Sequence, residues 1–221
     1  MRFNNRPSRF RASRDRGQAG SMGMDGREAW LNRSAGSTSA ENDVCVTHDD
    51  IALRAATDAD MDFLRDVFSS TRMHEFVSAG MPVEQAESLL ASQFSIQHTY
   101  YRQHYPHGRF DIIMQGTKNI GRLYHDWSGD VVQLIDIALL SAYRGAGIGT
   151  RLMRAIVTEA ARKHMRMQLY VEFDNPVRAL YRTLGFAPAG ENGIYELMHR
   201  DAMPFDEEAW ASVRGLNNPF Q

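Results

Sequence analysis

A glycine-rich run at residues 144–150 is the stretch of this sequence best suited to bind an anion. It reads RGAGIGT and lies between an apolar run and a segment whose apolar residues recur at helical spacing. Glycines let a backbone approach a ligand closely, and the first N–H groups of a helix have no partner inside that helix. The helix dipole adds partial positive charge at the same end. The run therefore predicts a phosphate site, against the plainer interpretation of a tight turn that binds nothing.

Two common phosphate-binding motifs match this run poorly. A dinucleotide-binding turn needs three glycines in the pattern GxGxxG, and here Gly145 and Gly147 are followed by Thr150 in the third place. No second doubly wound half follows the loop. A Walker loop needs a lysine, which the run lacks.

Patterns of apolar residues predict the elements that must position this loop. Strands are expected at residues 51–54, 110–115, 119–126, 131–140, 165–172, 186–188 and 194–198. Helices are expected after a capping signal at residues 57–60, and at residues 83–105, 147–163 and 176–184. This order predicts one layered, mixed α/β domain over residues 49–200.

The two ends of the chain differ from this domain in composition. Residues 1–40 contain eight arginines, three acidic residues and one leucine, with no valine or isoleucine. We expect residues 1–48 to form a disordered basic tail, because so few apolar side chains cannot offset the entropy lost on ordering. Three interpretations of this tail stay open. It could be an unselected extension, a basic arm that contacts nucleic acid or a partner, or a transit peptide. Residues 201–221 are expected to form a second tail, with a short helix at 206–213.

Global composition narrows the class of protein. The net charge is −2 and the pI is about 6.4, so nucleic acid and anionic membrane are not the expected partners. The single cysteine, Cys45, excludes an internal disulfide framework and fits a reducing compartment. No apolar run approaches the ~20 residues of a membrane span. The sequence therefore predicts a soluble, cytoplasmic globular protein.

Two ordered motifs resemble those of the GNAT superfamily of N-acetyltransferases. The first family motif places a Gln or Arg three residues before a Gly and five before a Gly or Ala, as Arg144, Gly147 and Gly149 do. The second is an Asn followed by LYxxxGF, and Asn175 and the run from Tyr181 to Phe186 resemble it. The resemblance covers about residues 51–200. It implies a mixed, mostly antiparallel sheet with splayed central parallel strands and helices on both faces.

The same resemblance implies acetyl-CoA as co-substrate, with no metal. Its pyrophosphate would lie on the amides of the loop, which are those of Arg144, Gly145, Ala146, Gly147, Ile148, Gly149 and Thr150. The backbone of Ile137, Ala138 and Leu139 would lie along the pantetheine arm, as an added strand would. The side-chain amide of Asn175 would contact the same arm, although six residues separate it from Tyr181 where seven are common.

The implied reaction is direct attack of an amine on the thioester. Tyr181 matches the family's general acid, and a phenol remains protonated at neutral pH. Many members carry a glutamate base eleven residues before the loop arginine, and Gln133 occupies that position here. Asp136 is the carboxylate inside the same predicted strand, so it becomes the candidate base, with Tyr170 or Glu172 acting through water as alternatives. Structural interpretations also stay open: aromatic packing for Tyr181 and a hydrogen-bonded buried carboxylate for Asp136.

A histidine-rich run near residue 100 invites a metal interpretation. Its members are His98, His104 and His107, and their spacing matches no zinc template. A helix end with aromatic packing is the preferred interpretation. Residues that could contact the acceptor are Tyr101, His104, Tyr124 and His125.

These observations predict an acyltransferase that moves an acetyl group from acetyl-CoA to a primary amine. The partner would be a small-molecule or peptide amine, and a homodimer is left open. A catalytically silent acyl-CoA binder is an alternative because Gln133 replaces the usual glutamate. A nucleic-acid-associated protein that acts through its basic tail is the other.

Overall fold

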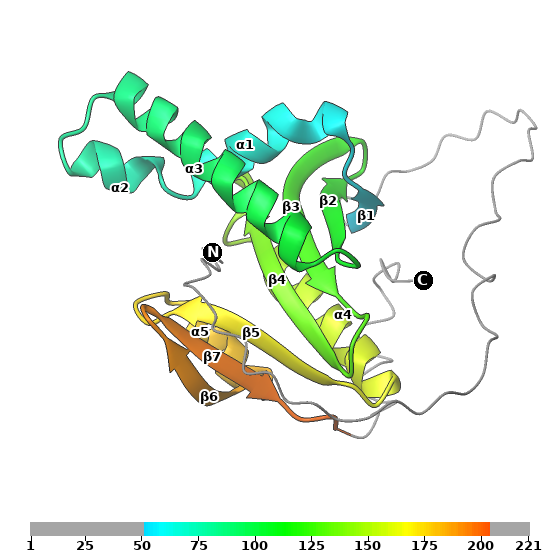
Figure 1. The fold of residues 1–221 in the computed structure, drawn as a ribbon. Helices are drawn as coiled ribbons and strands as arrows, with labels where there is room; N and C mark the ends of the chain where they lie inside the picture. The colour runs from blue at the N-terminus through cyan, green and yellow to red at the C-terminus, as the bar shows by residue number, and fades with distance from the viewer. Residues whose placement is uncertain (1–50, 204–221) are drawn as a thin grey trace, which may run out of the picture. The chain divides into compact units, whose positions relative to one another are not determined.

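The computed structural model describes residues 51–203, which carry all the elements discussed below (Figure 1). The tail expected at residues 1–48, and residues 204–221 of the tail expected at 201–221, including its helix at 206–213, lie outside the described residues. Within residues 51–203, no helix combines the length and the apolar character needed to cross a membrane.

The elements follow the predicted order closely. The strands are β1 (Ile51–Ala55), β2 (Arg109–Gln115), β3 (Lys118–Asp126), β4 (Val131–Leu139), β5 (Arg166–Glu172), β6 (Ala187–Asn192) and β7 (Tyr195–Arg200). The helices are α1 (Met61–Ser70), α2 (Met73–Ser78), α3 (Val83–His104), α4 (Ile148–Arg162) and α5 (Arg178–Thr183). Short 3-10 turns precede α1 at Asp58–Asp60 and α4 at Ser141–Tyr143.

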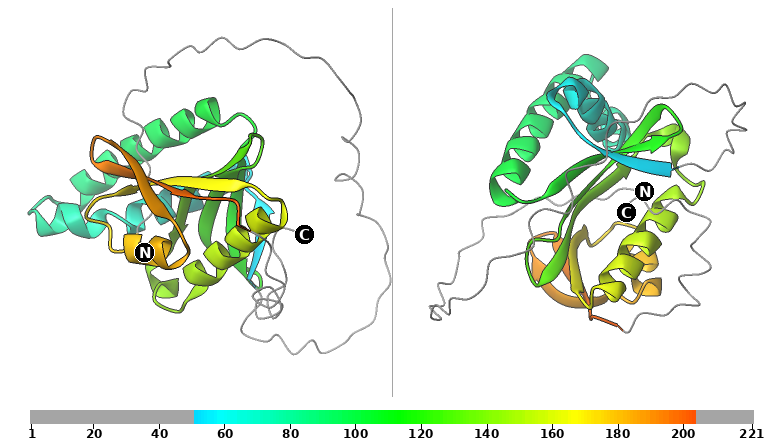
Figure 2. Two further views of the ribbon diagram at one scale, coloured as in Figure 1. Left: turned by 90° about the horizontal axis from the view of Figure 1, so that it is seen from below. Right: turned by 90° about the vertical axis from the view of Figure 1, so that its right-hand side faces the viewer.

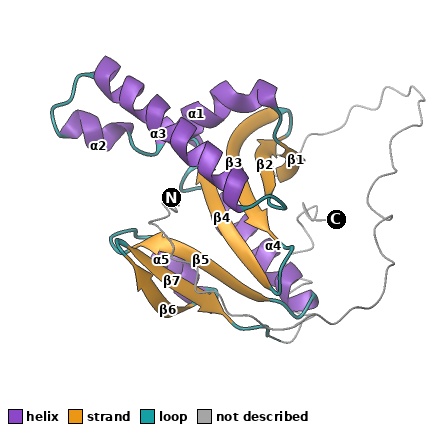
Figure 3. Ribbon diagram, in the orientation of Figure 1, coloured by secondary structure: helices purple, strands orange, loops and turns teal. Residues whose placement is uncertain are grey.

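The seven strands form one mixed sheet in the order β1-β2-β3-β4-β5-β7-β6. Every neighbouring pair is antiparallel except β4 and β5, which are parallel. Figure 3 shows the strands and the helices that cover them. The mixed α/β fold expected from the sequence is confirmed.

The two parallel strands pair over only part of their length. Residues 131–134 of β4 pair with residues 166–169 of β5. Beyond that point β4 continues to Leu139 and β5 to Glu172 without pairing to each other, and Figure 1 shows them diverging. The backbone edge of β4 that faces β5 is therefore open over its second half.

Helices lie on both faces of the sheet, and each face has its own core (Figure 2). Helix α4 packs on one face through Ile148, Leu152 and Ile156, which join a cluster with residues of all the central strands. Helices α1 and α3 pack on the other face, where Phe68 and Phe94 belong to a separate aromatic cluster. The predicted apolar stripes of α3 and α4 are buried as expected.

The predicted capping signal forms a capping box at the 3-10 turn that precedes α1. The Asp60 carboxylate accepts hydrogen bonds from the Thr57 backbone N–H at 2.8 Å and from its hydroxyl at 3.0 Å. Helix α1 ends where Ser70 and Thr71 donate their hydroxyls back to the carbonyls of Val67 and Phe68. Such side-chain bonds compete with the helical ladder, so the chain turns and a separate helix, α2, follows. Sequence periodicity did not predict α2, because it buries none of its residues.

A bulge in β4 changes which side chains face the α1–α3 layer. Tyr124 of β3 pairs with Asp136 and His125 pairs with Leu134, so Ile135 is an extra residue. Leu134 and Ile137 join the core under α4, whereas Ile135 joins the core under α1 and α3. A regular strand alternates its side chains, and an extra residue breaks that alternation. The bulge therefore places Ile135 and Asp136, two consecutive residues, on the same face.

Candidate active site

The glycine-rich loop forms an open turn at the start of α4. Gly145 and Gly147 both have φ of +80°, in the left-handed region that glycine adopts without strain. A Cβ added at either position would meet no atom within 4 Å, so the space in front of the turn is empty. Gly147 is the N-cap of α4, and the amides of the following first turn have no acceptor within the helix. The loop thus has the geometry of an anion site.

Arg144 is held at the junction of this loop with the sheet. Its Nε donates to the carbonyl of Leu139 at 2.7 Å, and its Nη2 donates to the Ser70 hydroxyl of α1 at 3.0 Å. These bonds tie the loop to the end of β4 and to the opposite helical layer. The positive charge of Arg144 therefore lies in a defined place beside the diverging strands.

The open edge of β4 presents backbone groups toward β5. The Leu140 N–H donates to the Ile120 carbonyl of β3, so residue 140 points toward β3. Because backbone groups of successive residues point to opposite edges of a strand, Ile137 and Leu139 present theirs to the open edge. Ala138, which lies between them, presents its own toward β3. Ile137 and the N–H of Leu139 can therefore pair with an extended ligand lying between the strands, whereas the Leu139 carbonyl already accepts from Arg144.

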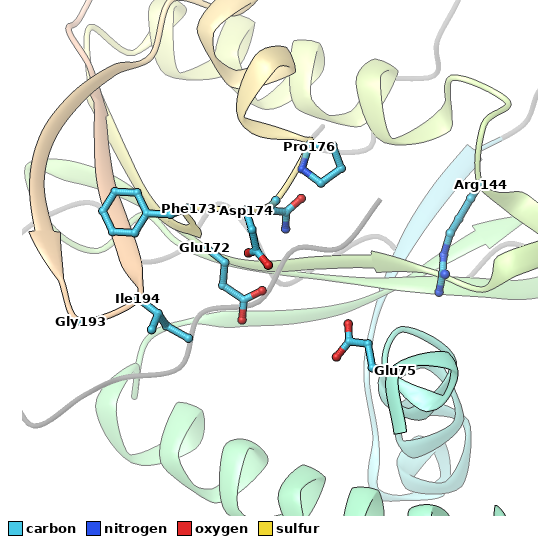
Figure 4. Close-up of a pocket in the computed structure, with 9 residues that line it drawn as sticks. Glu75, Arg144, Glu172, Phe173, Asp174, Pro176, Gly193 and Ile194 are labelled. Atoms are coloured by element: carbon cyan, nitrogen blue, oxygen red, sulfur yellow. The ribbon is translucent and has the colours of Figure 1, made fainter. Parts of the chain in front are cut away.

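A cleft of about 840 Å³ lies where β5 ends, between α2, the loop before α4 and the turn that joins β6 to β7. Its lining is Glu75, Arg144, Glu172, Phe173, Asp174, Asn175, Pro176, Gly193 and Ile194. Figure 4 shows the side chains of Glu75 and Glu172 extending toward one another across it. Three of the lining side chains are carboxylates and one is a guanidinium, so the described lining favours a cation over an anion.

Asn175 shapes the wall of this cleft. Its side-chain oxygen accepts the backbone N–H of Val177 at 3.1 Å, and its backbone N–H donates to the Glu172 carbonyl at 3.0 Å. The residue is 5% exposed. The Asn175 carboxamide therefore organises the turn between β5 and α5 as well as lining the cleft.

Tyr181 lies on α5 and is almost completely buried. Its ring packs edge-on against Phe186, with ring centroids 5.7 Å apart. Burial, together with the nearby negative charge of Asp136, raises the pKa of Tyr181 well above its ordinary value. The phenol therefore keeps its proton at neutral pH, which a general acid requires. Both interpretations of Tyr181, packing and proton donation, fit this placement.

Asp136 is buried on the α1–α3 face of β4. Its Oδ2 accepts from Arg122 Nη2 at 2.5 Å, and its buried Oδ1 has no hydrogen-bond partner. Burial raises the pKa of Asp136 above its ordinary value, although the Arg122 guanidinium acts in the opposite direction. The sequence could not indicate Arg122, because fourteen residues and a strand turn separate it from Asp136.

Gln133 lies below the point where β4 and β5 separate. Its side-chain nitrogen donates to the Leu134 carbonyl at 3.0 Å, and its oxygen accepts from Gln168 of β5 at 2.8 Å. This bridge lies where the strands still pair. Glu172, one of the alternative bases, lines the cleft and accepts from the Tyr195 hydroxyl at 3.3 Å. Burial raises the pKa of Tyr170, the other alternative.

The histidine-rich end of α3 packs as predicted. The His104 ring stacks on Tyr100, with ring centroids 3.5 Å apart and an interplanar angle of 18°. Within residues 51–203, no three His, Cys, Asp or Glu side chains cluster as a metal ion would need. Of the residues expected near the acceptor, Tyr101, Tyr124 and His125 are all buried at 1% exposure or less.

Glu75, Gly193 and Ile194 are cleft residues that the sequence did not indicate. Glu75 lies on the unexpected helix α2, and the other two lie in the turn between β6 and β7. No motif marks them, and only the folding of the chain brings them beside Glu172.

Comparison with known proteins identifies the family of this chain. The family model described as "Acetyltransferase (GNAT) family" matches residues 73–186, which is just over half of the chain. A search of curated protein sequences gives no match. Among solved structures, the chain is similar to the PaiA N-acetyltransferase from Thermoplasma acidophilum in complex with coenzyme A. The TM-score is 0.53 with 18% identity, over 68% of this chain and 98% of that one.

An acetyltransferase from Thermus thermophilus is a further neighbour. Its TM-score is 0.49 with 19% identity, over 70% of this chain and 98% of that one. At such identities a structural likeness concerns the fold alone, and the matched family model carries the assignment. The chain therefore belongs to the acetyltransferase (GNAT) family.

Proposed function

We propose that this protein transfers the acetyl group of acetyl-CoA to a primary amine that enters the cleft bounded by Glu75, Glu172 and Ile194. The separation of β4 from β5 beyond Leu134 and Leu169 carries the proposal. It leaves an open strand edge beside the acidic cleft, which Arg144 of the glycine-rich loop also lines. The coenzyme A bound to the Thermoplasma acidophilum enzyme of similar fold gives further support.

Residues of the loop, of the open edge of β4 and of the cleft wall would hold acetyl-CoA. The loop from Arg144 to Thr150 would bind the pyrophosphate through its amides, and the empty space in front of Gly145 and Gly147 fits that group. Backbone groups of Ile137 and Leu139 would pair with the pantetheine arm, with Ala138 between them. Asn175 would contact the same arm from the other side of the gap. When bound, acetyl-CoA supplies the activated acetyl group.

The reaction requires the protein to remove a proton from the amine, to stabilise the negative charge on the thioester oxygen and to supply a proton to the departing sulfur. Asp136 would accept the proton of the incoming amine by a relay from the cleft, because its own side chain is buried and lies outside the described lining. A backbone N–H of Ile137 or Leu139 would donate to the thioester oxygen as negative charge develops there. Tyr181 would donate its phenolic proton to the departing sulfur. Glu172, which lines the cleft, is the alternative base and would act through water.

The three carboxylates among the described cleft residues support a cationic amine as acceptor. A cleft of negative potential raises the local concentration of cations. The amine then loses its proton inside the cleft before it attacks. A screen of amines that differ in size and charge would identify the acceptor.

The test is release of free thiol from acetyl-CoA in the presence of each amine of the screen. Turnover with at least one primary amine, and no turnover with the matching alcohol, is the expected result. A silent acyl-CoA binder, the alternative that Gln133 suggests, would bind CoA in calorimetry but release no thiol with any amine. That outcome would reject the enzyme.

A further inference from the structure

Arg122 and Asp136 form an ion pair buried within the sheet layer, outside the described lining of the cleft. The Arg122 side chain is 3% exposed and that of Asp136 is 0% exposed. Removing two charges from water is costly, and breaking such a pair leaves an uncompensated charge. The pair therefore needs a reason beyond packing, since well-packed apolar side chains would serve a core equally well.

The pair exists only because of the bulge in β4. Arg122 of β3 lies opposite Ala138, two residues along β4 from Asp136. The extra residue Ile135 places Asp136 on the α1–α3 face, the face on which Arg122 meets α3. With regular alternation the Asp136 side chain would instead enter the apolar core beneath α4. The fold thus departs from regular strand geometry at the residue that brings the two charges together.

The guanidinium of Arg122 is held in place by uncharged groups. Its Nη2 donates both to Asp136 and, at 3.1 Å, to the side-chain oxygen of Gln97 on α3. Its central carbon lies 5.2 Å from the Tyr124 ring centroid and 5.7 Å from that of Phe68. Arg122 Nε is buried without a hydrogen-bond partner. Arg122 is therefore directed at one oxygen of Asp136 and leaves the other oxygen unpaired.

We infer that Arg122, held by Gln97, is a positioning residue that keeps the buried side chain of Asp136 in its carboxylate form. This inference rests on the proposed function, in which Asp136 is the base. An isolated carboxylate in such an apolar site would take up a proton at neutral pH and could then accept none. Arg122 opposes that protonation through its hydrogen bond to Oδ2.

Several other groups bear on the charge of Asp136. The phenols of Tyr124 on β3, Tyr101 on α3 and Tyr181 on α5 lie close enough for electrostatic interaction with it. Arg72, between α1 and α2, is a more distant positive charge that acts in the same direction as Arg122. The three phenols are neutral at physiological pH. Arg122 is therefore the dominant charged neighbour of Asp136.

The test compares Arg122→Met with Arg122→Lys in the full-length protein. In the Met variant the acidic limb of the kcat/KM profile should move to higher pH by at least about one unit, because an adjacent opposite charge is removed. The rate should recover partly at the alkaline end. Lys restores the positive charge without the planar guanidinium, so the acidic limb of the Lys variant should lie between those of the Met variant and wild type. A residue that only supports the fold would lower the rate at every pH without moving the limb.

Arg54→Met is the control, because Arg54, on β1 at the edge of the sheet, forms a more exposed ion pair with Asp60. It should leave the limb in place. If Arg122→Met does not fold, Gln97→Leu loosens the same guanidinium and should move the limb in the same direction by a smaller amount. A folded Arg122→Met or Gln97→Leu protein whose limb is unchanged would overturn the inference.

A titration of the Asp136 carboxyl by carbon-13 NMR separates this inference from the proposed function. The signal is assigned by its loss in Asp136→Asn. If no amine is acetylated, the proposed function fails, but the titration still reports whether Arg122 sets the charge. A carboxylate at neutral pH in wild type that becomes protonated in Arg122→Met supports the role of Arg122. The same charge in both proteins rejects it.

Discussion

Leu134 of β4 and Leu169 of β5 are the last two residues paired before the parallel strands separate. Below them Gln133 and Gln168 bridge the strands through their side chains. Above them Ile137 and Leu139 present backbone groups to an unpaired edge. The transition from a closed to an open sheet thus occurs within a few residues, and the proposed binding groups all lie on its open side.

Gly147→Glu should weaken CoA binding by at least about tenfold, or ~1.4 kcal/mol. The new carboxylate would lie where the pyrophosphate is proposed to bind. Calorimetry with CoA measures the effect. Because Gly147 has a positive φ, any side chain there is strained, so Gly147→Ala is the control for strain alone. Equal CoA affinity in wild type and a folded Glu variant would place the pyrophosphate elsewhere.

Tyr181→Phe should lower kcat by about 10²–10⁴-fold, the usual contribution of general acid catalysis. The ring and its packing against Phe186 remain, so CoA affinity and melting temperature should change little. Steady-state kinetics and calorimetry together make the comparison. An unchanged kcat would leave Tyr181 with a packing role only.

Asp136→Asn should lower kcat/KM and remove the acidic limb of its pH profile. A base is active when ionised, so activity in the wild-type enzyme falls as the pH drops through the pKa of Asp136, and an amide has no such transition. The control is Glu172→Gln, which removes the other candidate base. Persistence of the limb in Asp136→Asn, with its loss in Glu172→Gln, would transfer the role to Glu172.

Asp60→Asn should lower the free energy of unfolding at pH 7 by about 1–2 kcal/mol, because Asp60 both completes the capping box of the 3-10 turn before α1 and pairs with Arg54. These partners hold the pKa of Asp60 well below its ordinary value. The stabilisation is therefore complete above the unfolded-state pKa of about 4 and is lost as the pH falls further. Urea titrations of both proteins should converge in acid. Asp62→Asn, at an exposed pair with Arg65, should change stability by less than about 0.5 kcal/mol.

Gly121→Ala should destabilise the protein by about 2 kcal/mol or more. A Cβ at Gly121 would lie 2.3 Å from the Ala138 carbonyl oxygen and 2.8 Å from a Leu139 methyl, so β3 and β4 would have to separate. Thermal denaturation measures the loss. Gly129→Ala is the control, because a Cβ there meets nothing within 4 Å. Similar melting temperatures for the two variants would contradict the close approach.

Local sequence determined the glycine-rich loop and every described α-helix and strand except α2. The stripe that includes Ala86, Leu90 and Phe94 predicts α3 because burial of one helix face repeats at the helical period, and each member is buried. The loop was equally predictable, because Gly145 and Gly147 have a positive φ, a conformation that glycine adopts without strain. The capping signal at residues 57–60 is likewise a contact between near neighbours.

Tertiary structure alone decided what these elements bring together. The apolar run 131–140 predicts a strand but carries no sign of the bulge at Ile135, since the register depends on pairing with β3. The same pairing selects Arg122 as the partner of Asp136. The cleft joins Glu75 to Glu172 and Ile194, residues about a hundred positions apart, through the packing of α2 near the end of β5. Periodicity indicates which face of an element is buried, whereas long-range pairing decides which side chains meet. One extra residue in a strand is enough to move a side chain to the other face of the sheet.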